Sequence, residues 1–204
     1  MELGNRIIYL KKLTLKYKRD FKVLFNDQEM CSYLSIPYPI TVSWIDEYIT
    51  ESMDLFDRGE KYTWGIFKAG TEQMIGVGVL RDIDYKNRVA RIGYSTGRKY
   101  WNNGYTMMAV KFMLHYAFKE LELNRIEVRV DKNDDRSIKL LENIGGEREG
   151  ILRQAFFYNG KYRDIDIYSI LKNEYYEIIK EKKNKRGSII TRSEITAMEN
   201  MISI

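Results

Sequence analysis

The sequence predicts an α+β domain built around a mixed β-sheet. Three strand-like runs follow one another between residues 62 and 94 with short polar connections, a pattern typical of a meander. Helical segments precede this meander, and helical and strand-like segments alternate after it. Strands that gather at the centre of the chain, with helices on both sides in the sequence, favour a central sheet flanked by helices.

The N-terminal part is expected to form one strand and two helices. Residues 6–10 are a short β-like run, and residues 14–33 carry apolar side chains at helical spacing. The two prolines of the chain end this first helix, because the residue before a proline is pushed out of the helical region. Thr41 or Ser43 can cap the second helix, which runs to about Arg58.

Strands and helices then alternate. Helices are expected at residues 106–121 and 136–143, the second ended by Gly145 and Gly146. The dipeptide Asn159-Gly160 between the last two strands is a strong signal for a hairpin turn. The strands are expected at residues 62–67, 74–80, 89–94, 125–130, 151–158 and 164–171.

The C-terminal segment is basic. Residues 172–192 contain seven cations and three glutamates, so most of the net charge of +5 lies there and the rest of the chain is close to neutral. A solvated basic helix explains this distribution, and we therefore expect no nucleic-acid partner. The sequence predicts a domain of residues 1–175 and a basic helical extension of residues 176–204, which includes a short helix at residues 195–202 after a capping-box pattern.

Composition narrows the class of protein further. The chain has one cysteine, and no apolar run approaches the roughly 20 residues of a membrane span. No cluster of cysteine, histidine and carboxylate residues has the spacing of metal ligands. We expect a cytoplasmic protein with no membrane partner and no metal.

The segment Tyr100-Trp-Asn-Asn-Gly-Tyr-Thr106 carries the strongest chemical signal. It stands directly before a long helix, whose first turn offers unpaired backbone N–H groups and about half a positive charge. Gly104 lets the backbone approach an anion closely, and Thr106 can serve as the N-cap. These features favour a binding site for a diphosphate, although an ordinary loop and helix cap would also explain them.

Together with other motifs, this loop resembles the coenzyme-A loop of the GNAT superfamily of N-acetyltransferases, closest to the branch of the ribosomal-protein alanine N-acetyltransferases. The resemblance covers about residues 5–172 in the right order. It rests on Gly93-Tyr94, the loop with the Met-Met-Ala-Val that follows it, Arg136-Ser137 with Leu-Leu-Glu-Asn-Ile-Gly145, Glu149-Gly-Ile-Leu-Arg153, Asn159-Gly160, Asp164 and Tyr168-Ser-Ile-Leu171. Two residues depart from the family pattern: Asn102 stands where glycine is common, and Thr106 replaces the closing glycine or alanine.

The resemblance implies a GNAT-like fold, with a mixed, mainly antiparallel sheet and a splayed fourth and fifth strand at residues 89–95 and 125–130. Acetyl-CoA, as co-substrate, would lie between these two strands. A backbone N–H near Tyr94 or Ser95 would stabilise the oxyanion that forms from the acyl carbonyl. The implied coenzyme-binding residues are Tyr94, Ser95, Thr96, Trp101, Asn102, Asn103, Gly104, Tyr105, Thr106, Asn133 and Ser137.

The resemblance also suggests candidates for the catalytic acid and base. Ser137 matches a serine that lies near the coenzyme sulfur in the alanine-acetylating branch, and Tyr94 and Asp164 are the other catalytic candidates. An amine with a pKa of about 8 to 10 must lose a proton before it attacks. Two positions depart from common family acids and bases: Arg91 stands where a glutamate is frequent, and Leu141 where a tyrosine is frequent.

Several carboxylates could act as the base, and a chain of waters would serve equally well. An ordinary surface or salt-bridged role is the alternative for each of these carboxylates. The candidates are Asp82, Asp84, Glu127, Asp164 and Asp166.

The sequence therefore predicts an enzyme that transfers an acetyl group from acetyl-CoA to a primary amine by direct attack on the thioester. The acceptor would be a protein N-terminus or a small amine. By the resemblance, specificity lies at about residues 34–43 and 157–163, and a highly charged polyamine is less expected because both loops are rich in tyrosine rather than acidic residues. The replacements at Arg91 and Leu141 leave a second hypothesis, a non-catalytic acyl-CoA-binding sensor on the same fold. A homodimer is a further expectation.

Overall fold

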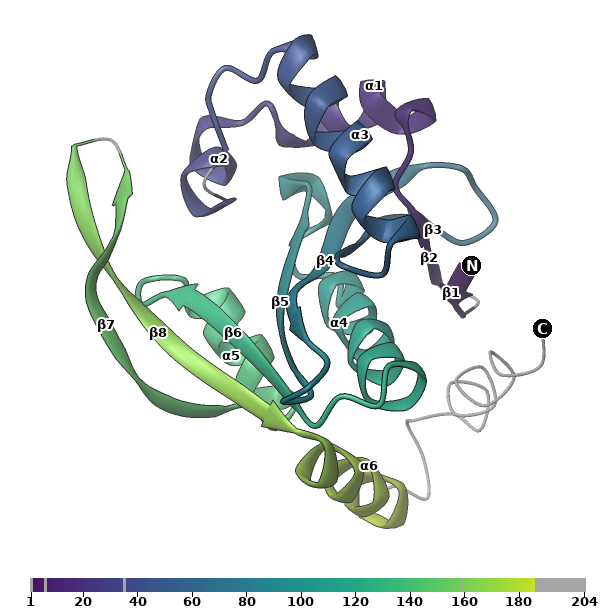
Figure 1. Cartoon of the computed structure of the whole chain (residues 1–204), viewed down its shortest axis with the longest axis vertical. Coiled ribbons are helices and arrows are strands. Elements are labelled where there is room, and N and C mark those ends of the chain that lie inside the picture. Colours follow the sequence, from purple (N-terminus) through teal and green to yellow (C-terminus); the bar gives the residue numbers. More distant parts are fainter. Residues whose placement is uncertain (1, 6, 35, 159, 186–204) are drawn as a thin grey trace.

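The computed structural model describes residues 2–5, 7–34, 36–158 and 160–185, and within them eight strands form one sheet (Figure 1). The strand order across the sheet is β1-β2-β3-β4-β5-β6-β8-β7. The predicted α+β class with a mixed sheet is confirmed. In chain order the strands are β1 Glu2–Gly4, β2 Ile8–Lys12, β3 Tyr62–Lys68, β4 Met74–Asp84, β5 Val89–Thr96, β6 Arg125–Asp131, β7 Glu147–Tyr158 and β8 Lys161–Leu171.

One parallel pair interrupts an otherwise antiparallel sheet. Strands β5 and β6 run parallel, and they pair only at Val89 with Arg125, Ala90 with Ile126 and Arg91 with Glu127. Beyond Arg91 the two strands continue without pairing and diverge, as Figure 1 shows. This is the expected splay of the fourth and fifth strands. The expected fourth and fifth strands are labelled β5 and β6 because the sequence did not predict the three-residue edge strand β1.

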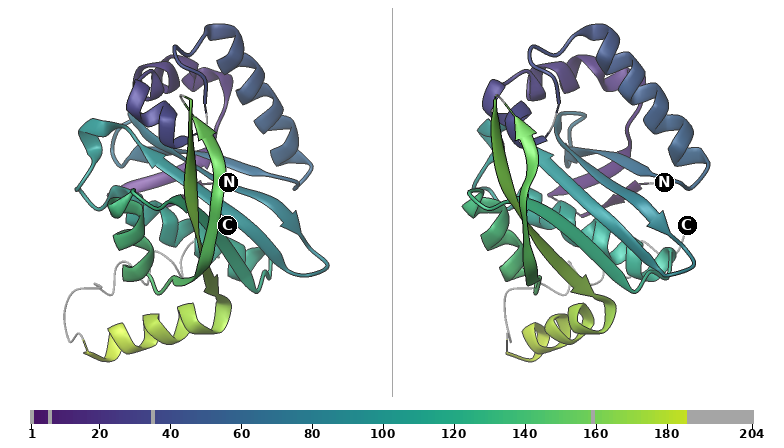
Figure 2. Two further views of the ribbon diagram at one scale, coloured as in Figure 1. Left: turned by 90° about the vertical axis from the view of Figure 1, so that its left-hand side faces the viewer. Right: turned by 60° about the vertical axis from the view of Figure 1, so that its left-hand side comes forward.

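Helices cover both faces of the sheet (Figure 2). Helices α1 and α3 pack on one face of the sheet, against β3 and β4. Helices α4 and α5 pack on the opposite face. The helical segments are η1 Leu15–Tyr17, α1 Lys18–Phe25, α2 Gln28–Leu34, α3 Val42–Asp57, η2 Arg98–Tyr100, α4 Tyr105–His115, η3 Tyr116–Glu120, α5 Asp135–Asn143 and α6 Lys172–Lys185. None of the helices in the described ranges has both the length and the apolar character that a membrane crossing requires.

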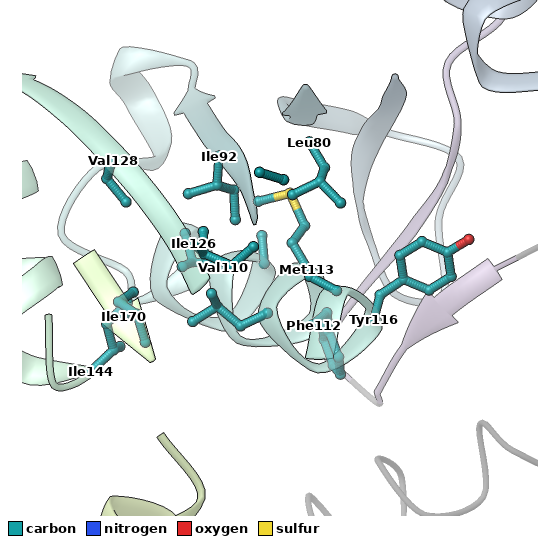
Figure 3. Close-up of a cluster of buried hydrophobic side chains, with 14 of the residues drawn as sticks. Leu80, Ile92, Val110, Phe112, Met113, Tyr116, Ile126, Val128, Ile144 and Ile170 are labelled. Atoms are coloured by element: carbon teal, nitrogen blue, oxygen red, sulfur yellow. The ribbon is translucent and has the colours of Figure 1, made fainter. Parts of the chain in front are cut away.

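The larger core lies between the sheet and helices α4 and α5. Val110 and Met113 of α4 are fully buried against strand residues such as Ile126, and Figure 3 shows this cluster. A Cβ atom at Gly78 of β4 would lie 2.4 Å from the sulfur of Met113, so the glycine leaves room for the end of this side chain. Met113 thereby packs α4 against the centre of the sheet.

The single helix predicted at residues 14–33 is wrong, because the chain breaks at Asn26 and Asp27 into η1, α1 and α2. The Asp27 carboxylate accepts a hydrogen bond from the Met30 N–H, and the Asn26 side chain accepts one from the Ile40 N–H. These side-chain bonds to the backbone compete with continued helix. For α3 the structure selects Thr41 as the N-cap, whose hydroxyl accepts from the Trp44 N–H at 3.2 Å.

The C-terminal helix α6 begins at Lys172, ahead of the predicted domain boundary at residue 175. Tyr175 is buried, and its ring lies 5.5 Å from that of Phe118, so the first turn of α6 packs on the domain. The division into residues 1–175 and 176–204 stays a prediction. The helix predicted at residues 195–202 lies outside the described residues.

Candidate functional site

The loop after β5 folds back onto the end of that strand. The indole N–H of Trp101 donates to the carbonyl of Thr96 at 2.9 Å, and the Asn103 side chain donates to the Trp101 carbonyl at 2.9 Å. The guanidinium carbon of Arg136, on α5, lies 3.4 Å from the centre of the Trp101 ring. Trp101 is therefore held by two elements, and the loop is fixed in shape even though Asn102, Asn103 and Gly104 are exposed.

Gly104, with a φ of 74°, is the N-cap of α4, so the expectation that Thr106 caps this helix is wrong. A left-handed φ is readily available only to glycine, which explains the residue type here. Nothing lies within 4 Å of the position a Cβ atom would take, so the space beside the first turn is open. The Thr106 hydroxyl instead lies 2.9 Å from that of Thr96, which joins the helix start to the end of β5.

The first turn of α4 has the properties of an anion site. Its first backbone hydrogen bond in the described chain runs from the Met108 N–H to the Gly104 carbonyl, so the N–H groups ahead of it have no helical acceptor. The helix dipole adds partial positive charge at the same end. The predicted loop residues are thus brought together around an open space with outward-facing donors, which suits a diphosphate.

The end of β5 presents a second set of unpaired groups. Since β5 and β6 stop pairing after Arg91, the β5 backbone groups that would face β6 lack a strand partner up to Thr96. Buried backbone groups normally find a partner, and an extended ligand with amide groups could supply one here. Tyr94 and Ser95, which the family resemblance placed near the oxyanion, belong to this stretch.

Tyr94, one of the catalytic candidates from the sequence, also places its side chain here. Its hydroxyl oxygen is buried, and within the described chain it has no hydrogen-bond partner. Burial raises the pKa of Tyr94, while the hydroxyl of Ser137 acts in the opposite direction. The hydroxyl therefore stays protonated and is left with an unused donor beside Ser137, at the point where β5 leaves β6. A tyrosine that directly follows a strand glycine was the available sequence signal.

Ser137 has a structural bond of its own. Its hydroxyl donates to the Asp134 carboxylate at 2.8 Å, and the other oxygen of that carboxylate accepts from the Ser137 N–H at 3.2 Å. Asp134 is the N-cap of α5, so this pair stabilises the start of the helix. Asn133, also predicted to bind coenzyme, uses its side-chain amide on Asp131 at 3.0 Å. Both residues hold the turn between β6 and α5 in place.

Two of the candidate bases, Asp82 on β4 and Glu127 on β6, are held by arginine. Arg91 donates to Glu127 at 2.9 Å and to Asp82 at 3.1 Å, and Arg129 donates to the same oxygen of Glu127 at 2.8 Å. Arg91, which stands where the family often has a glutamate, thus forms ion pairs with two of its potential replacements.

The remaining carboxylate candidates are also engaged. Lys132 and the Gln154 N–H hold Asp164 and lower its pKa, and Arg148 pairs with the buried Asp166 at 2.8 Å. Asp84 has a lowered pKa because the backbone and side chain of Asn87 donate to it in the turn after β4. The contacts of Asp164 lie on β7 and after β6, so the structure does not bring it together with Tyr94 and Ser137. Its catalytic role stays a prediction.

The site as a whole joins three features: an anion-binding helix start, a strand with unpaired backbone groups, and a buried phenol at the point where two strands part. This combination would suit an extended ligand that carries a diphosphate at one end. In the part of the chain that the structure describes, no three His, Cys, Asp or Glu side chains gather as a metal ion would require.

Comparison with known proteins identifies the family. The model of the acetyltransferase (GNAT) domain matches residues 8–147. The chain is 34% identical over 173 residues to the uncharacterized N-acetyltransferase p20 of Bacillus licheniformis, a match that spans 82% of this chain and 97% of that protein. It is 26% identical over 150 residues to spermidine N(1)-acetyltransferase of Escherichia coli K12, spanning 74% of this chain and 77% of that protein. The chain belongs to the GNAT acetyltransferase family, as the sequence motifs indicated.

Solved structures agree on the fold. A crystal structure of a probable acetyltransferase matches with a TM-score of 0.78 and 27% identity, covering 85% of this chain and 98% of the other. Spermidine N-acetyltransferase from Vibrio cholerae, in complex with CoA and spermine, matches with a TM-score of 0.76 and 23% identity, covering 84% and 99%. The GNAT fold is therefore established for this chain.

Proposed function

We propose that this protein transfers the acetyl group of acetyl-CoA to a primary amine, either a protein N-terminus or a small molecule. One observation carries the proposal: the open N-terminus of α4 stands at the end of β5, where β5 and β6 separate. A single ligand with a diphosphate at one end and amide groups along its length fits both parts at once.

Different segments of the chain would bind different parts of acetyl-CoA. The loop from Trp101 to Gly104 and the first turn of α4 would hold the diphosphate of acetyl-CoA, which supplies the thioester. The unpaired backbone of β5 would bond the amides of the pantetheine arm. A backbone N–H at Tyr94 or Ser95 would then donate to the thioester oxygen and stabilise the negative charge that develops on it during attack.

The buried hydroxyl of Tyr94 would stabilise the leaving thiolate. When the amine nitrogen bonds to the carbonyl carbon, the carbon–sulfur bond breaks and negative charge passes to the sulfur. The Tyr94 hydroxyl stays protonated because burial raises its pKa, and it would donate a hydrogen bond to this sulfur. Ser137 lies beside it as a second candidate, with its own proton directed at Asp134.

Proton removal from the amine is assigned to water. Glu127 and Asp82 are tied to arginines, and the pKa of Asp164 is lowered by Lys132. A water chain between the splayed strands needs no single residue as base, which makes the replacement of a family glutamate by Arg91 tolerable.

A two-stage experiment tests this function. Acetyl-CoA should raise the melting temperature, and thiol release should then depend on the amine in a panel of small amines and peptides. No stabilisation at millimolar acetyl-CoA would contradict both coenzyme binding and catalysis.

A second candidate function is an acyl-CoA sensor without turnover, favoured by the arginine pairing of Glu127 and Asp82. It predicts the same stabilisation by acetyl-CoA with no thiol release for any amine. Several relatives are named as acetyltransferases of spermidine or of ribosomal protein, which supports an amine acceptor in general without selecting one.

A further inference from the structure

We propose that the acceptor carries a carboxylate close to its reactive amine, and that Arg129 binds this carboxylate. The inference rests on the proposed acetyl transfer and names the class of substrate for the same site. It follows from where Arg129 stands on β6 and from how the charges around it are paired.

Arg129 lies on the face of the sheet opposite α4. Side chains alternate along a strand, so Glu127 and Arg129 share one face of β6, and Arg91 joins them from β5 through its bond to Glu127. Ala90 and Ile126, on the other face, are buried in the core against α4. The diphosphate site and α5 occupy that other face, which leaves the face of Arg129 for the incoming amine.

Arg129 is also the first residue of its face beyond the last paired position of β5 and β6. The final pair is Arg91 with Glu127, and Arg129 follows two residues later, where the strands have begun to part. The thioester would lie in this widening gap, close to Tyr94 and Ser95. A group bound to Arg129 would therefore lie close to the amine that attacks.

The guanidinium of Arg129 has hydrogen-bond donors that no acceptor in the described chain uses. Its Nε donates to Glu127, and in the described part of the chain its Nη1 and Nη2 have no acceptor. The side chain is 40% exposed, so a ligand can reach it. A guanidinium fork with two free donors matches the two oxygens of a carboxylate.

The surrounding charges favour the same partner. Arg91 and Arg129 hold Glu127, Arg91 also holds Asp82, and Arg163 with Asn133 holds Asp131 at the end of β6. In the described chain, each of these three carboxylates around Arg129 therefore already has a cationic partner. The exposed Arg81, paired across from Arg91 on β4, adds positive charge, which Glu51 of α3 offsets in part because both residues act on Lys61. This arrangement disfavours a polyamine and favours an acceptor with negative charge.

Two sources could supply the carboxylate: the α-carboxylate of a free amino acid, or an acidic side chain just after a peptide N-terminus. Matched acceptors separate them. One pair is alanine and alaninamide, with rates corrected for the fraction of neutral amine. The other is a peptide beginning Ala-Asp and its Ala-Asn counterpart, both amidated at the C-terminus. We expect kcat/KM about tenfold higher for the acidic member of one pair, mainly through a lower KM for the acceptor.

Variants then assign the preference to Arg129. Arg129→Gln should reduce the preference to less than about twofold, and Arg129→Lys should retain part of it because the charge remains without the fork. Lys86→Gln removes a similar charge from the exposed turn after β4, at the far end of β5, and should leave the preference intact. An unchanged melting-temperature shift with acetyl-CoA would show that each variant is folded and binds coenzyme.

The outcomes distinguish this inference from the proposed function. Turnover of neutral and acidic acceptors at equal rates, or a preference that survives Arg129→Gln, would overturn the role of Arg129 while leaving acetyl transfer in place. If no amine is acetylated, calorimetric binding of both acceptor pairs to the CoA complex still tests the site. Equal affinities within each pair, alanine against alaninamide and Ala-Asp against Ala-Asn, would then reject it.

Discussion

Replacing Gly104 with alanine should weaken coenzyme binding far more than it destabilises the fold. Gly104 has a φ of 74° and no protein atom within 4 Å of the position of a Cβ atom. The new methyl group therefore meets nothing inside the protein. It projects into the space that a bound diphosphate needs, and it strains the backbone that presents the N–H donors.

The magnitude follows from these two effects. A left-handed conformation costs an alanine roughly 1–2 kcal/mol, which corresponds to a melting temperature lower by a few degrees for a domain of this size. Loss of one hydrogen bond to a charged phosphate costs about 1.5–3 kcal/mol. That energy corresponds to a dissociation constant for coenzyme A weaker by roughly 10- to 100-fold. The Gly104→Val variant should bind coenzyme A more weakly still, because a β-branched side chain tolerates this φ poorly.

Gly70 supplies a matched control. It lies in the turn between β3 and β4 with a φ of 73°, and nothing stands within 4 Å of its Cβ position. Gly70→Ala should lower the melting temperature by a similar amount and leave the affinity for coenzyme A, measured by calorimetry, unchanged. An affinity within twofold of wild type for Gly104→Ala, or an equal loss for Gly70→Ala, would refute the assignment of the loop.

Three further predictions follow from the site and its surroundings. Tyr94→Phe should lower kcat without lowering the melting temperature, because the buried hydroxyl has no partner to lose within the described chain; an unchanged kcat would remove the phenol from catalysis. Ser137→Ala should lower kcat more than it raises KM for acetyl-CoA in steady-state kinetics. It should also cost about 1 kcal/mol of stability at the cap of α5. An effect on KM alone would make Ser137 a binding residue. Arg125 and Ser169 lower the pKa of Glu149 to about 2, so its contribution to stability is present above about pH 4.5 and is lost as the pH falls towards 2. Glu149→Gln should flatten denaturant-measured stability over that window by less than about 1 kcal/mol, because the side chain is 41% exposed, and a wild-type slope in the variant would contradict the pairing.

Features that depend on neighbouring residues were predictable from the sequence. The Thr41 cap involves a residue three positions away, and the turn at Gly160 is framed by the pairing of Tyr158 with Lys161. The loop from Trp101 to Gly104 belongs to the same group, since a left-handed glycine and the first turn of a helix adjoin in the chain. Strand alternation likewise placed β6 within one residue of its observed limits.

Features that join distant segments were not predictable in this way. The first helix looked continuous because its interruption depends partly on the Ile40 N–H, fourteen residues beyond Asn26. Thr106 looked like a cap because its bond to Thr96 requires β5 and α4 to be placed first. The candidate bases could not be ranked, since Arg91 and Glu127 are thirty-six residues apart in the chain and meet only through the parallel register of β5 and β6.

The sequence by itself determined the family, the fold class and the loop that suits a diphosphate, because short motifs and residue periodicity encode local backbone geometry directly. Only the tertiary structure decided which polar side chains are already paired and which have donors available for a ligand. Sheet register pairs the carboxylates with arginines, leaves two donors of Arg129 without an acceptor in the described chain, and buries the Tyr94 hydroxyl without a partner. Charge pairing and burial depend on distances in space, and those distances are set when the strands come together.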